Sequence, residues 1–272
     1  MYKRELSIFF NAVTFLTRIR VPGHIAHSPE LLEETPRYYP VVGMIVGLIS
    51  SAVYLLTDMI FNPDIAVAAA IIAGIFTTGA FHEDGFADVC DAFGGGWTKE
   101  KILTIMKDSR LGSFGVIGLI GILTLKFLLI RELFEYTNSG SEYGFINPEY
   151  QFIIGIFLCA HASSRLMPQY MLRKYPYVAD IDASKSKPIT KQKPTATKLS
   201  ITGLFAVLPF TLIGFPYLAA LIPMSIATLL MGRFFGKWIG GYTGDCLGAI
   251  QQVTEILFYA GAVLVFKFVY LA

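Results

Sequence analysis

The sequence contains few charged residues. Only 15% of its 272 residues are Asp, Glu, Lys or Arg, whereas 54% are hydrophobic. The mean hydropathy is +0.57, and the apolar residues are clustered in long runs that lack amphipathic spacing. Soluble globular domains seldom have such a composition. The sequence therefore predicts an all-α, polytopic integral membrane protein. The net charge of +2 is too small to indicate a nucleic-acid partner.

Several motifs of soluble enzymes are missing. The three cysteines, Cys90, Cys159 and Cys246, are far apart and form no CxxC pair, which argues against a zinc knuckle or a disulfide framework. There is no GxSxG sequence, and none of the four histidines has a convincing nucleophile partner, which argues against a hydrolytic triad. Neither a Walker A loop nor a GxGxxG motif is present.

The apolar runs predict about seven spans, because each is long enough for about 30 Å of hydrocarbon. They cover residues 39–61, 64–81, 113–134, 151–171, 199–215, 217–232 and 255–271. The first apolar stretch, Leu6 to Leu16, is short and is interrupted by Asn11, so we expect an N-terminal interfacial helix and no cleavable signal peptide. No internal repeat or second soluble domain is visible, and residues 1–272 are expected to form one membrane-embedded domain.

The basic residues indicate an orientation. With seven spans, residues 1–38, 82–112, 172–198 and 233–254 lie on one side of the membrane, and they contain 18 of the 22 Lys and Arg residues. By the positive-inside rule this side faces the cytoplasm, across a cell inner membrane. The 172–198 segment is rich in Lys, Ser, Thr and Pro, which is typical of a solvated linker or of a strip that binds anionic headgroups.

The segment from His82 to Gly96 (HEDGFADVCDAFGGG) places acids directly after an apolar run. Charges at a membrane edge are costly unless they are solvated, paired or bound to metal. In a helix, Asp84, Asp88 and Asp91 would lie within about 60° of one another on one face. Three such carboxylates repel unless a cation lies between them, and Mg²⁺ suits oxygen ligands. The sequence therefore predicts a metal site at Asp84, Asp88 and Asp91, with His82 and Glu83 pointing away.

Glycines and basic residues follow the acids. Gly94, Gly95 and Gly96 would let the backbone approach a phosphate, although three glycines alone are a weak signal. Lys107 and Arg110 stand at the entry of the third span, where they could neutralise phosphate oxygens or act as ordinary interfacial anchors.

Two more residues are candidates because of where they occur. Arg165 falls inside the fourth span, where it should face a carboxylate, a cavity or a ligand. Asp245 is an isolated acid in a glycine-rich segment, and could complete a metal shell, serve as a base or cap a helix. Carboxylates, glycines and basic groups at one membrane face fit metal-assisted chemistry on a phosphate or diphosphate.

The acidic segment closely resembles the hallmark sequence of the cobalamin synthase family, also called adenosylcobinamide-GDP ribazoletransferase. The matching string is FHEDGFADVCDAFGGGWTKEKILTIMKDSRLGSFGVIGL, and three further stretches agree: FLTRIRVP, YPYVADIDASKSKP and GRFFGKWIGGYTGDCLGA. The resemblance implies an inner-membrane transferase of the last stages of vitamin B12 biosynthesis. Such enzymes join GDP-activated cobinamide to α-ribazole or its 5′-phosphate, release GMP and require Mg²⁺.

The resemblance also implies roles for the matched residues. Asp84, Asp88 and Asp91 would hold Mg²⁺ on the diphosphate, and Lys107 and Arg110 would bind phosphate. Asp245 would be a second ligand or the base, with Asp91 the other catalytic acid. Lys187 lies in the matching SKSKP stretch, which favours a substrate-binding role. The implied partners are the two substrates and the lipid bilayer, and other B12-assembly enzymes or a second copy of the chain are further candidates.

Two alternatives remain at this point. A CDP-alcohol phosphotransferase also binds Mg²⁺ through spaced aspartates, but its usual pattern has an alanine-arginine pair, whereas Ala87 is followed here by Asp88. A cation-coupled transporter would place its acids on broken helices in mid-membrane. These acids instead stand at the cytoplasmic end of a span with basic residues nearby, which favours phosphate chemistry.

Overall fold

The computed structural model describes residues 2–135, 148–179 and 193–270, and every regular element in these ranges is a helix. The elements are α1 (Tyr2–Leu16), α2 (Pro29–Glu33), α3 (Tyr39–Asp58), α4 (Pro63–Thr78), α5 (Phe81–Gly95), α6 (Lys99–Met106), α7 (Ser113–Glu135), α8 (Pro148–Leu166), α9 (Gln169–Lys174), α10 (Ala196–Val207), α11 (Leu221–Ile239) and α12 (Gly244–Val265). Short 3₁₀ turns precede α3 and separate α10 from α11, and a π-helical turn follows α12. The all-α prediction is confirmed.

Four helical segments are long and apolar enough to cross a membrane: Thr35–Asp58, Ser113–Glu135, Phe215–Ile239 and Gly244–Val269. The bent pair α4 and α5 makes a fifth if it counts as one span. Each of the seven predicted apolar runs lies largely within helix, but α4 has only 16 residues and α10 only 12. At 1.5 Å per residue, α4 is about 24 Å long, which is short for a full span. The predicted number of seven is therefore not confirmed, whereas the multi-pass character is.

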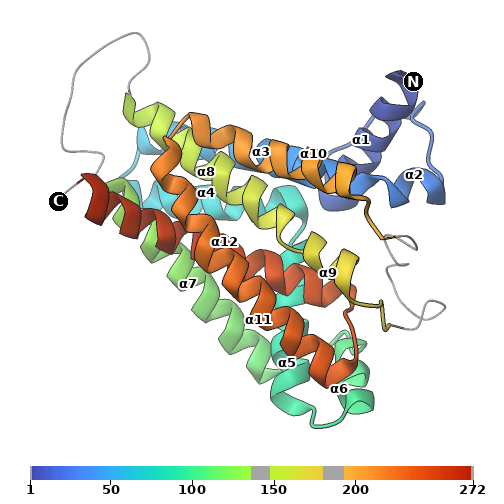
Figure 1. Cartoon of the computed structure of the whole chain (residues 1–272). Coiled ribbons are helices and arrows are strands. Elements are labelled where there is room, and N and C mark those ends of the chain that lie inside the picture. Colours follow the sequence, from blue (N-terminus) through green and yellow to red (C-terminus); the bar gives the residue numbers. More distant parts are fainter. Residues whose placement is uncertain (1, 136–147, 180–192, 271–272) are drawn as a thin grey trace.

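The helices form a layered bundle (Figure 1). Helices α3, α4, α8 and α10 pack together in one layer, and α7 and α11 run obliquely below it. Helix α12 packs against α5, α7, α8 and α11, and 16 of its 22 residues are buried, so it is the central element. The start of α1 and the end of α12 lie at opposite ends of the molecule.

Small residues allow the closest helix contact in the upper layer. Gly43 and Gly47 lie one turn apart on α3, and a Cβ atom at Gly47 would lie 2.7 Å from the backbone oxygen of Phe157 on α8. At Gly43 an added Cβ would clash in the same way with the backbone of His161. This is the GxxxG arrangement by which membrane helices bring their backbones together.

A sharp bend separates α4 from α5. Gly79 ends α4 with φ +68°, and Ala80 follows with φ +58°, a left-handed conformation that is uncommon for residues other than glycine. The two residues turn the chain by 90°. Helix α5 therefore begins across the end of α4 and packs against α12 and α7.

One predicted boundary was wrong. Residues 233–254 were expected to form a loop, but α11 continues to Ile239 and α12 begins at Gly244, with Thr243 as its N-cap. Only residues 240–243 link the two helices. The apolar pattern was obscured because the first three turns of α12 contain Asp245, Gln251 and Gln252.

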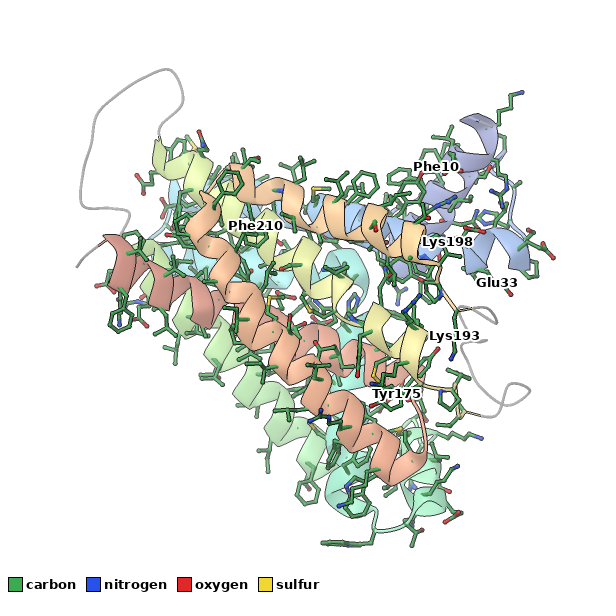
Figure 2. The ribbon with its side chains drawn as sticks, viewed as in Figure 1. Phe10, Glu33, Tyr175, Lys193, Lys198 and Phe210 are labelled. Carbon is green, nitrogen blue, oxygen red and sulfur yellow. The ribbon has the colours of Figure 1, made fainter. Side chains whose placement is uncertain are left out.

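Several charged side chains lie at the end of the bundle that α1, α2 and α9 form. Figure 2 shows Glu33, Lys193 and Lys198 at the end where α1, α2 and α9 lie, whereas Phe210 lies well away from it. Lys198 forms an ion pair with Glu34 at 3.0 Å, and Phe210 is fully buried. Described residues of segments 1–38 and 172–198, which the sequence predicted to lie on one side of the membrane, thus lie at the same end of the bundle.

Candidate functional site

A cleft of about 390 Å³ opens between α5, α6 and the start of α12, and we call it the acidic cleft. It is lined by Phe81, Asp84, Gly85, Asp88, Leu103, Met106, Lys107, Asp108, Ser109, Tyr177, Ala179, Thr243, Gly244 and Asp245. Apart from Phe81, these residues come from three segments that the sequence assigned to the same side of the membrane. The fold brings the three segments together around one cavity whose size suits a small-molecule site.

Asp84 and Asp88 lie one turn apart on α5, and both line the acidic cleft. Asp245 reaches the same cleft from the first turn of α12. Its capping role, the alternative from the sequence, falls instead to Thr243, whose hydroxyl oxygen accepts a hydrogen bond from the Cys246 amide at 3.4 Å. The Asp245 carboxylate accepts a hydrogen bond from the Thr243 hydroxyl at 3.3 Å and lines the cleft at the start of α12, where the positive end of the helix dipole favours its charge.

Two glycines let the backbones of α5 and α12 approach. A Cβ atom at Gly85 would lie 3.0 Å from the Cα of Asp245, and one at Gly248 would lie 3.2 Å from the backbone oxygen of His82. Larger side chains at these positions would force the helices apart. The glycines thus explain how acids about 160 residues apart in sequence share one cleft.

Asp91 has a different environment. Its carboxylate accepts hydrogen bonds from the backbone amides of Gly112 at 2.7 Å and Gly115 at 2.8 Å, at the start of α7. It therefore caps α7 and does not line the acidic cleft. Within the part of the chain that the structure describes, no three His, Cys, Asp or Glu side chains come close enough to hold a metal ion. The predicted triad of Asp84, Asp88 and Asp91 is not assembled.

The remaining donors still fit Mg²⁺. This ion is usually held by one or two carboxylates together with water and substrate phosphates, not by a cage made only of protein. Asp84 and Asp88 offer two carboxylates one turn apart on α5, and Asp245 lines the same cleft without forming a three-ligand group with them. A magnesium site that protein and substrate share needs carboxylate oxygens beside a space that the substrate phosphates can enter, and the acidic cleft offers both.

The two predicted basic residues are placed differently. Lys107 lines the acidic cleft, whereas Arg110 does not. Arg110 is exposed and donates hydrogen bonds to Asp108, with a closest contact of 2.6 Å. These hydrogen bonds lower the pKa of Asp108 to about 2. Among the described residues Lys107 is therefore the basic side chain that lines the cleft, and Arg110 would have to leave Asp108 to bind a phosphate.

Two glycines of the trio, Gly94 and Gly96, allow close contacts between helices. A Cβ at Gly94 would clash with the Phe114 ring on α7, and one at Gly96 would lie 2.7 Å from the Ile102 Cγ1 atom on α6. Gly95 is exposed at the end of α5, and none of the three lines the acidic cleft. The close contacts of α5 with α6 and α7 account for Gly94 and Gly96, so their phosphate-binding role gains no support from this arrangement. Lys187 lies outside the described residues.

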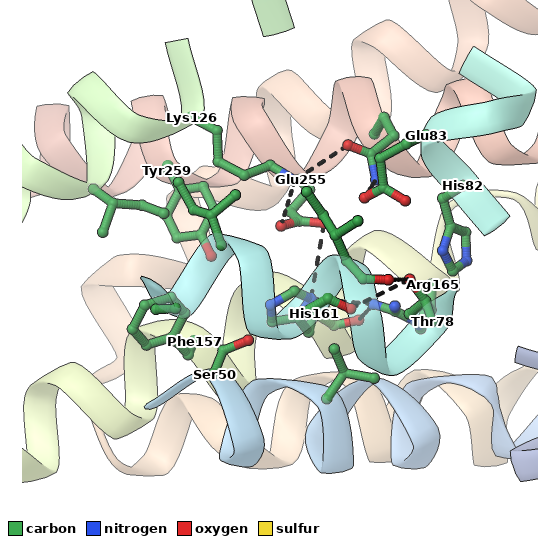
Figure 3. Close-up of a pocket in the computed structure, with 17 residues that line it drawn as sticks. Ser50, Thr78, His82, Glu83, Lys126, Phe157, His161, Arg165, Glu255 and Tyr259 are labelled. Atoms are coloured by element: carbon green, nitrogen blue, oxygen red, sulfur yellow. Dashed lines mark hydrogen bonds and ion pairs between the residues drawn. The ribbon is translucent and has the colours of Figure 1, made fainter. Parts of the chain in front are cut away.

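Arg165 lies in a buried polar cluster, which also contains Glu83, Lys126, His161, Gln252 and Glu255 (Figure 3). It donates hydrogen bonds to the backbone oxygen of His161 at 3.0 Å, and it is only 3% exposed. The cluster surrounds a cavity of about 20 Å³, enough for about one water molecule. The prediction that Arg165 would face a cavity agrees with this geometry, but the cavity is distinct from the acidic cleft.

Hydrogen bonds link this cluster to α5. Lys126 Nζ lies 3.1 Å from Glu255 Oε1 and donates to Gln252 Oε1 at the same distance. Gln252 in turn donates to Glu83 Oε1 at 2.9 Å. Glu83 immediately precedes Asp84, so the buried cluster helps to fix the rotation of α5 that turns Asp84 toward the acidic cleft.

Sequence reasoning missed Lys126, Gln252 and Glu255. Lys126 falls inside an apolar run, which is itself a signal, because an ionisable residue within a span needs a partner. Glu255 was placed at the first position of the last predicted span, and no partner was predicted for it. His82 and Glu83 were correctly expected to point away from the acids, although no partner for them could be named.

Comparison with known proteins decides the family. A family model described as cobalamin-5-phosphate synthase matches residues 8–263. Curated relatives named adenosylcobinamide-GDP ribazoletransferase include proteins of Shewanella frigidimarina, 40% identical with 94% of both chains covered, and of Leptospira interrogans, 38% identical with 95% of this chain and 96% of the relative covered. A Vibrio cholerae relative is 37% identical, over 94% of this chain and 92% of its own. The chain belongs to the cobalamin-5-phosphate synthase family. No solved structure matches it.

The family match confirms the resemblance seen in the sequence motifs. It also covers the whole acidic cleft and the whole buried polar cluster, because their residues all lie between positions 8 and 263. The chain is thus a transferase of cobalamin synthesis. Membership of the cobalamin-5-phosphate synthase family removes the grounds for the CDP-alcohol phosphotransferase and transporter alternatives.

Proposed function

We propose that the acidic cleft transfers the cobinamide phosphate group of adenosylcobinamide-GDP to α-ribazole or its 5′-phosphate, with release of GMP. The relatives' names supply the reaction. The acidic cleft is the proposed location of this reaction because four side chains converge on it: Asp84, Asp88, Asp245 and Lys107. Carboxylates beside a basic group are the side chains that a diphosphate substrate requires.

The reaction breaks one bond and forms one bond at phosphorus. A ribose hydroxyl of the acceptor attacks the phosphorus on the cobinamide side, and the bond to the GMP oxygen breaks. Bound Mg²⁺ would neutralise the diphosphate oxygens and stabilise the leaving GMP. Asp84 and Asp88 would hold this ion, and Lys107 would bind a phosphate oxygen.

Asp245 is the better placed of the two catalytic candidates to accept the hydroxyl proton. It lines the acidic cleft, whereas Asp91 lies outside the cleft and accepts hydrogen bonds from the amides of Gly112 and Gly115. A base must lie within hydrogen-bonding reach of the proton that it accepts. We therefore assign the base to Asp245.

The proposed location is a cell inner membrane, with the acidic cleft on the cytoplasmic side. Eighteen of the 22 basic residues lie in segments that the positive-inside rule assigns to the cytoplasm. The cleft is built from three of those segments.

The test is a GMP-release assay with purified protein in liposomes. Adenosylcobinamide-GDP and α-ribazole are supplied with Mg²⁺, and GMP is measured with and without EDTA. We expect release that depends on both the acceptor and the metal. Absence of GMP from well-folded protein would reject the proposed reaction, and release that survives EDTA would reject the metal.

Gly85→Val should lower kcat/KM about a hundredfold, because the new side chain would push Asp84 and Asp88 away from Asp245. The matched control is Gly203→Val, since a Cβ at Gly203 meets no atom within 4 Å. GMP release and thermal unfolding are measured for both variants. Normal turnover in Gly85→Val would mean that the α5–α12 spacing does not position the reacting groups.

A further inference from the structure

A short non-helical segment follows α9 and pairs with the link between α11 and α12. We call it the 175–178 segment. The backbone amide of Val178 donates a hydrogen bond to the Tyr242 oxygen at 3.0 Å, and the Tyr242 amide donates to the Pro176 oxygen at the same distance. The two bonds form an isolated parallel β-bridge. The segment therefore fixes both backbone groups of Tyr242, three residues before Asp245.

Gly241 allows the two strands of this bridge to approach. A Cβ atom at Gly241 would clash with the backbone oxygen of Pro176, and it would lie 2.6 Å from Val178 Cγ1. Any side chain at this position would push the link away from the 175–178 segment. The Tyr177 and Tyr242 rings meet edge to face with centroids 5.6 Å apart, which adds a packing contact to the hydrogen bonds.

The 175–178 segment is itself anchored on α11. Gly232 and Gly236 lie one turn apart on this helix, and the Tyr175 ring lies against both. An added Cβ would lie 3.2 Å from Tyr175 Cε2 at Gly232 and 2.7 Å from Cε1 at Gly236. Figure 2 shows Tyr175 at the end of α9, beside α11. The segment thus has its own attachment to the bundle, and it can hold the link in place.

The bridge leads directly to the acidic cleft. Tyr177, Thr243 and Asp245 all line the cleft. Thr243 follows Tyr242 in the chain, and its hydroxyl donates to Asp245 Oδ2 at 3.3 Å. A shift of the Tyr242 backbone would move Thr243 with it and would displace the Asp245 carboxylate.

The side chains proposed to hold the donor substrate lie on other elements. Asp84 and Asp88 belong to α5, and Lys107 follows α6. None of them takes part in the bridge between the 175–178 segment and Tyr242. Loss of the bridge should therefore affect the proposed base and leave the binding of the donor in place.

We propose that the 175–178 segment positions Asp245 for proton transfer, through its β-bridge with Tyr242 and through the Thr243 hydroxyl. A base must lie within hydrogen-bonding reach of the proton that it accepts, so a small displacement is costly. The members of the segment are positioning residues, because they act through Asp245. This assignment rests on the proposed function, in which Asp245 is the base.

Gly241→Ala tests the proposal, because its Cβ forces the link away from the Pro176 oxygen. We expect kcat for GMP release to fall at least about tenfold, whereas the KM for adenosylcobinamide-GDP stays within about twofold. The control is Gly121→Ala on α7, since a Cβ at Gly121 meets no atom within 4 Å. An unchanged kcat in Gly241→Ala would overturn the proposal.

A double-mutant cycle with Asp245→Asn separates positioning from general damage to the fold. The residual GMP release of Asp245→Asn is followed with radiolabelled donor. If the segment acts through Asp245, adding Gly241→Ala to Asp245→Asn should change kcat by less than about twofold. An equal loss in both backgrounds would overturn the proposal while the proposed function stands.

Val178→Pro breaks the same bridge from its other side. Proline has no backbone amide, so the hydrogen bond to the Tyr242 oxygen is lost. The variant should show the same fall in kcat and the same lack of effect in the Asp245→Asn background. It carries the test if Gly241→Ala does not fold, and additive losses would again contradict positioning.

Hydrogen exchange followed by mass spectrometry tests the coupling without turnover. The Tyr242 amide bonds to Pro176, and the Cys246 amide bonds to the Thr243 hydroxyl. Both amides should exchange slowly in the wild type and faster in Gly241→Ala. This result supports the coupling even if the wild type releases no GMP, in which case only the proposed function fails. Unchanged protection of Cys246 beside faster exchange at Tyr242 would overturn the coupling through Thr243.

Discussion

Replacing Asp84 or Asp88 with Asn is expected to reduce GMP release by at least about a thousandfold, equivalent to ~4 kcal/mol. Both carboxylates line the acidic cleft from one face of α5. Asn preserves the size of each side chain but removes the charge that would hold Mg²⁺ on the diphosphate. Membrane insertion and helix content, measured by membrane fractionation and circular dichroism, should remain as in the wild type.

The control is Glu100→Gln, which neutralises an exposed acid on α6 outside the acidic cleft and should leave turnover unchanged. Near-normal turnover in Asp84→Asn would remove the metal assignment from this cleft. Titration of Mg²⁺ against turnover adds a second readout, since a partly active variant should need more of the ion.

The same assay on Asp91→Asn separates the two possible roles of Asp91. As the cap of α7, it should matter mainly for stability, because its carboxylate accepts the amides of Gly112 and Gly115. Loss of turnover with unchanged thermal stability would instead restore the metal-ligand role that the sequence predicts.

The acidic segment shows which features of the site the sequence could predict and which it could not. Its helical conformation, and the shared face of Asp84 and Asp88, follow from spacing alone. Asp91 is close to that face by angle, but it lies about 10 Å further along the axis than Asp84. Over that distance α5 passes from the acidic cleft to the start of α7. Helical periodicity gives the angle of a side chain and says nothing about which neighbour lies beside each turn.

The sequence also predicted on which side of the membrane Asp245 lies, but by a different argument. Counting basic residues placed its segment on the same side as the acidic segment, and the structure brings both to one cleft. The buried polar cluster was out of reach, because its members come from α5, α7, α8 and α12 and meet only through tertiary packing. A lysine within an apolar run signals that a partner exists, but not which helix supplies it.

Lys126→Met should lower the free energy of unfolding by about 3–5 kcal/mol, because it leaves the Glu255 carboxylate buried without its closest cation. Lys126 is 4% exposed and Glu255 is 2% exposed. The Lys126 Nζ atom lies 3.1 Å from Glu255 Oε1. Thermal unfolding in detergent, followed by circular dichroism, measures the loss. The double variant Lys126→Met/Glu255→Gln removes both charges and should recover most of it.

Arg131→Met provides the matched control on the same helix. Arg131 forms ion pairs with Asp64 at 2.8 Å and Glu135 at 3.0 Å, but all three side chains are exposed. Exposed pairs contribute at most about 1 kcal/mol, so this variant should unfold close to the wild type. If Lys126→Met were equally stable, the charge of Glu255 would have to be balanced by Arg165 and His161 instead. Gln252 joins Lys126 to Glu83 through hydrogen bonds. Loss of Lys126 should therefore also lower turnover, because α5 would no longer be held in the orientation that points Asp84 into the acidic cleft.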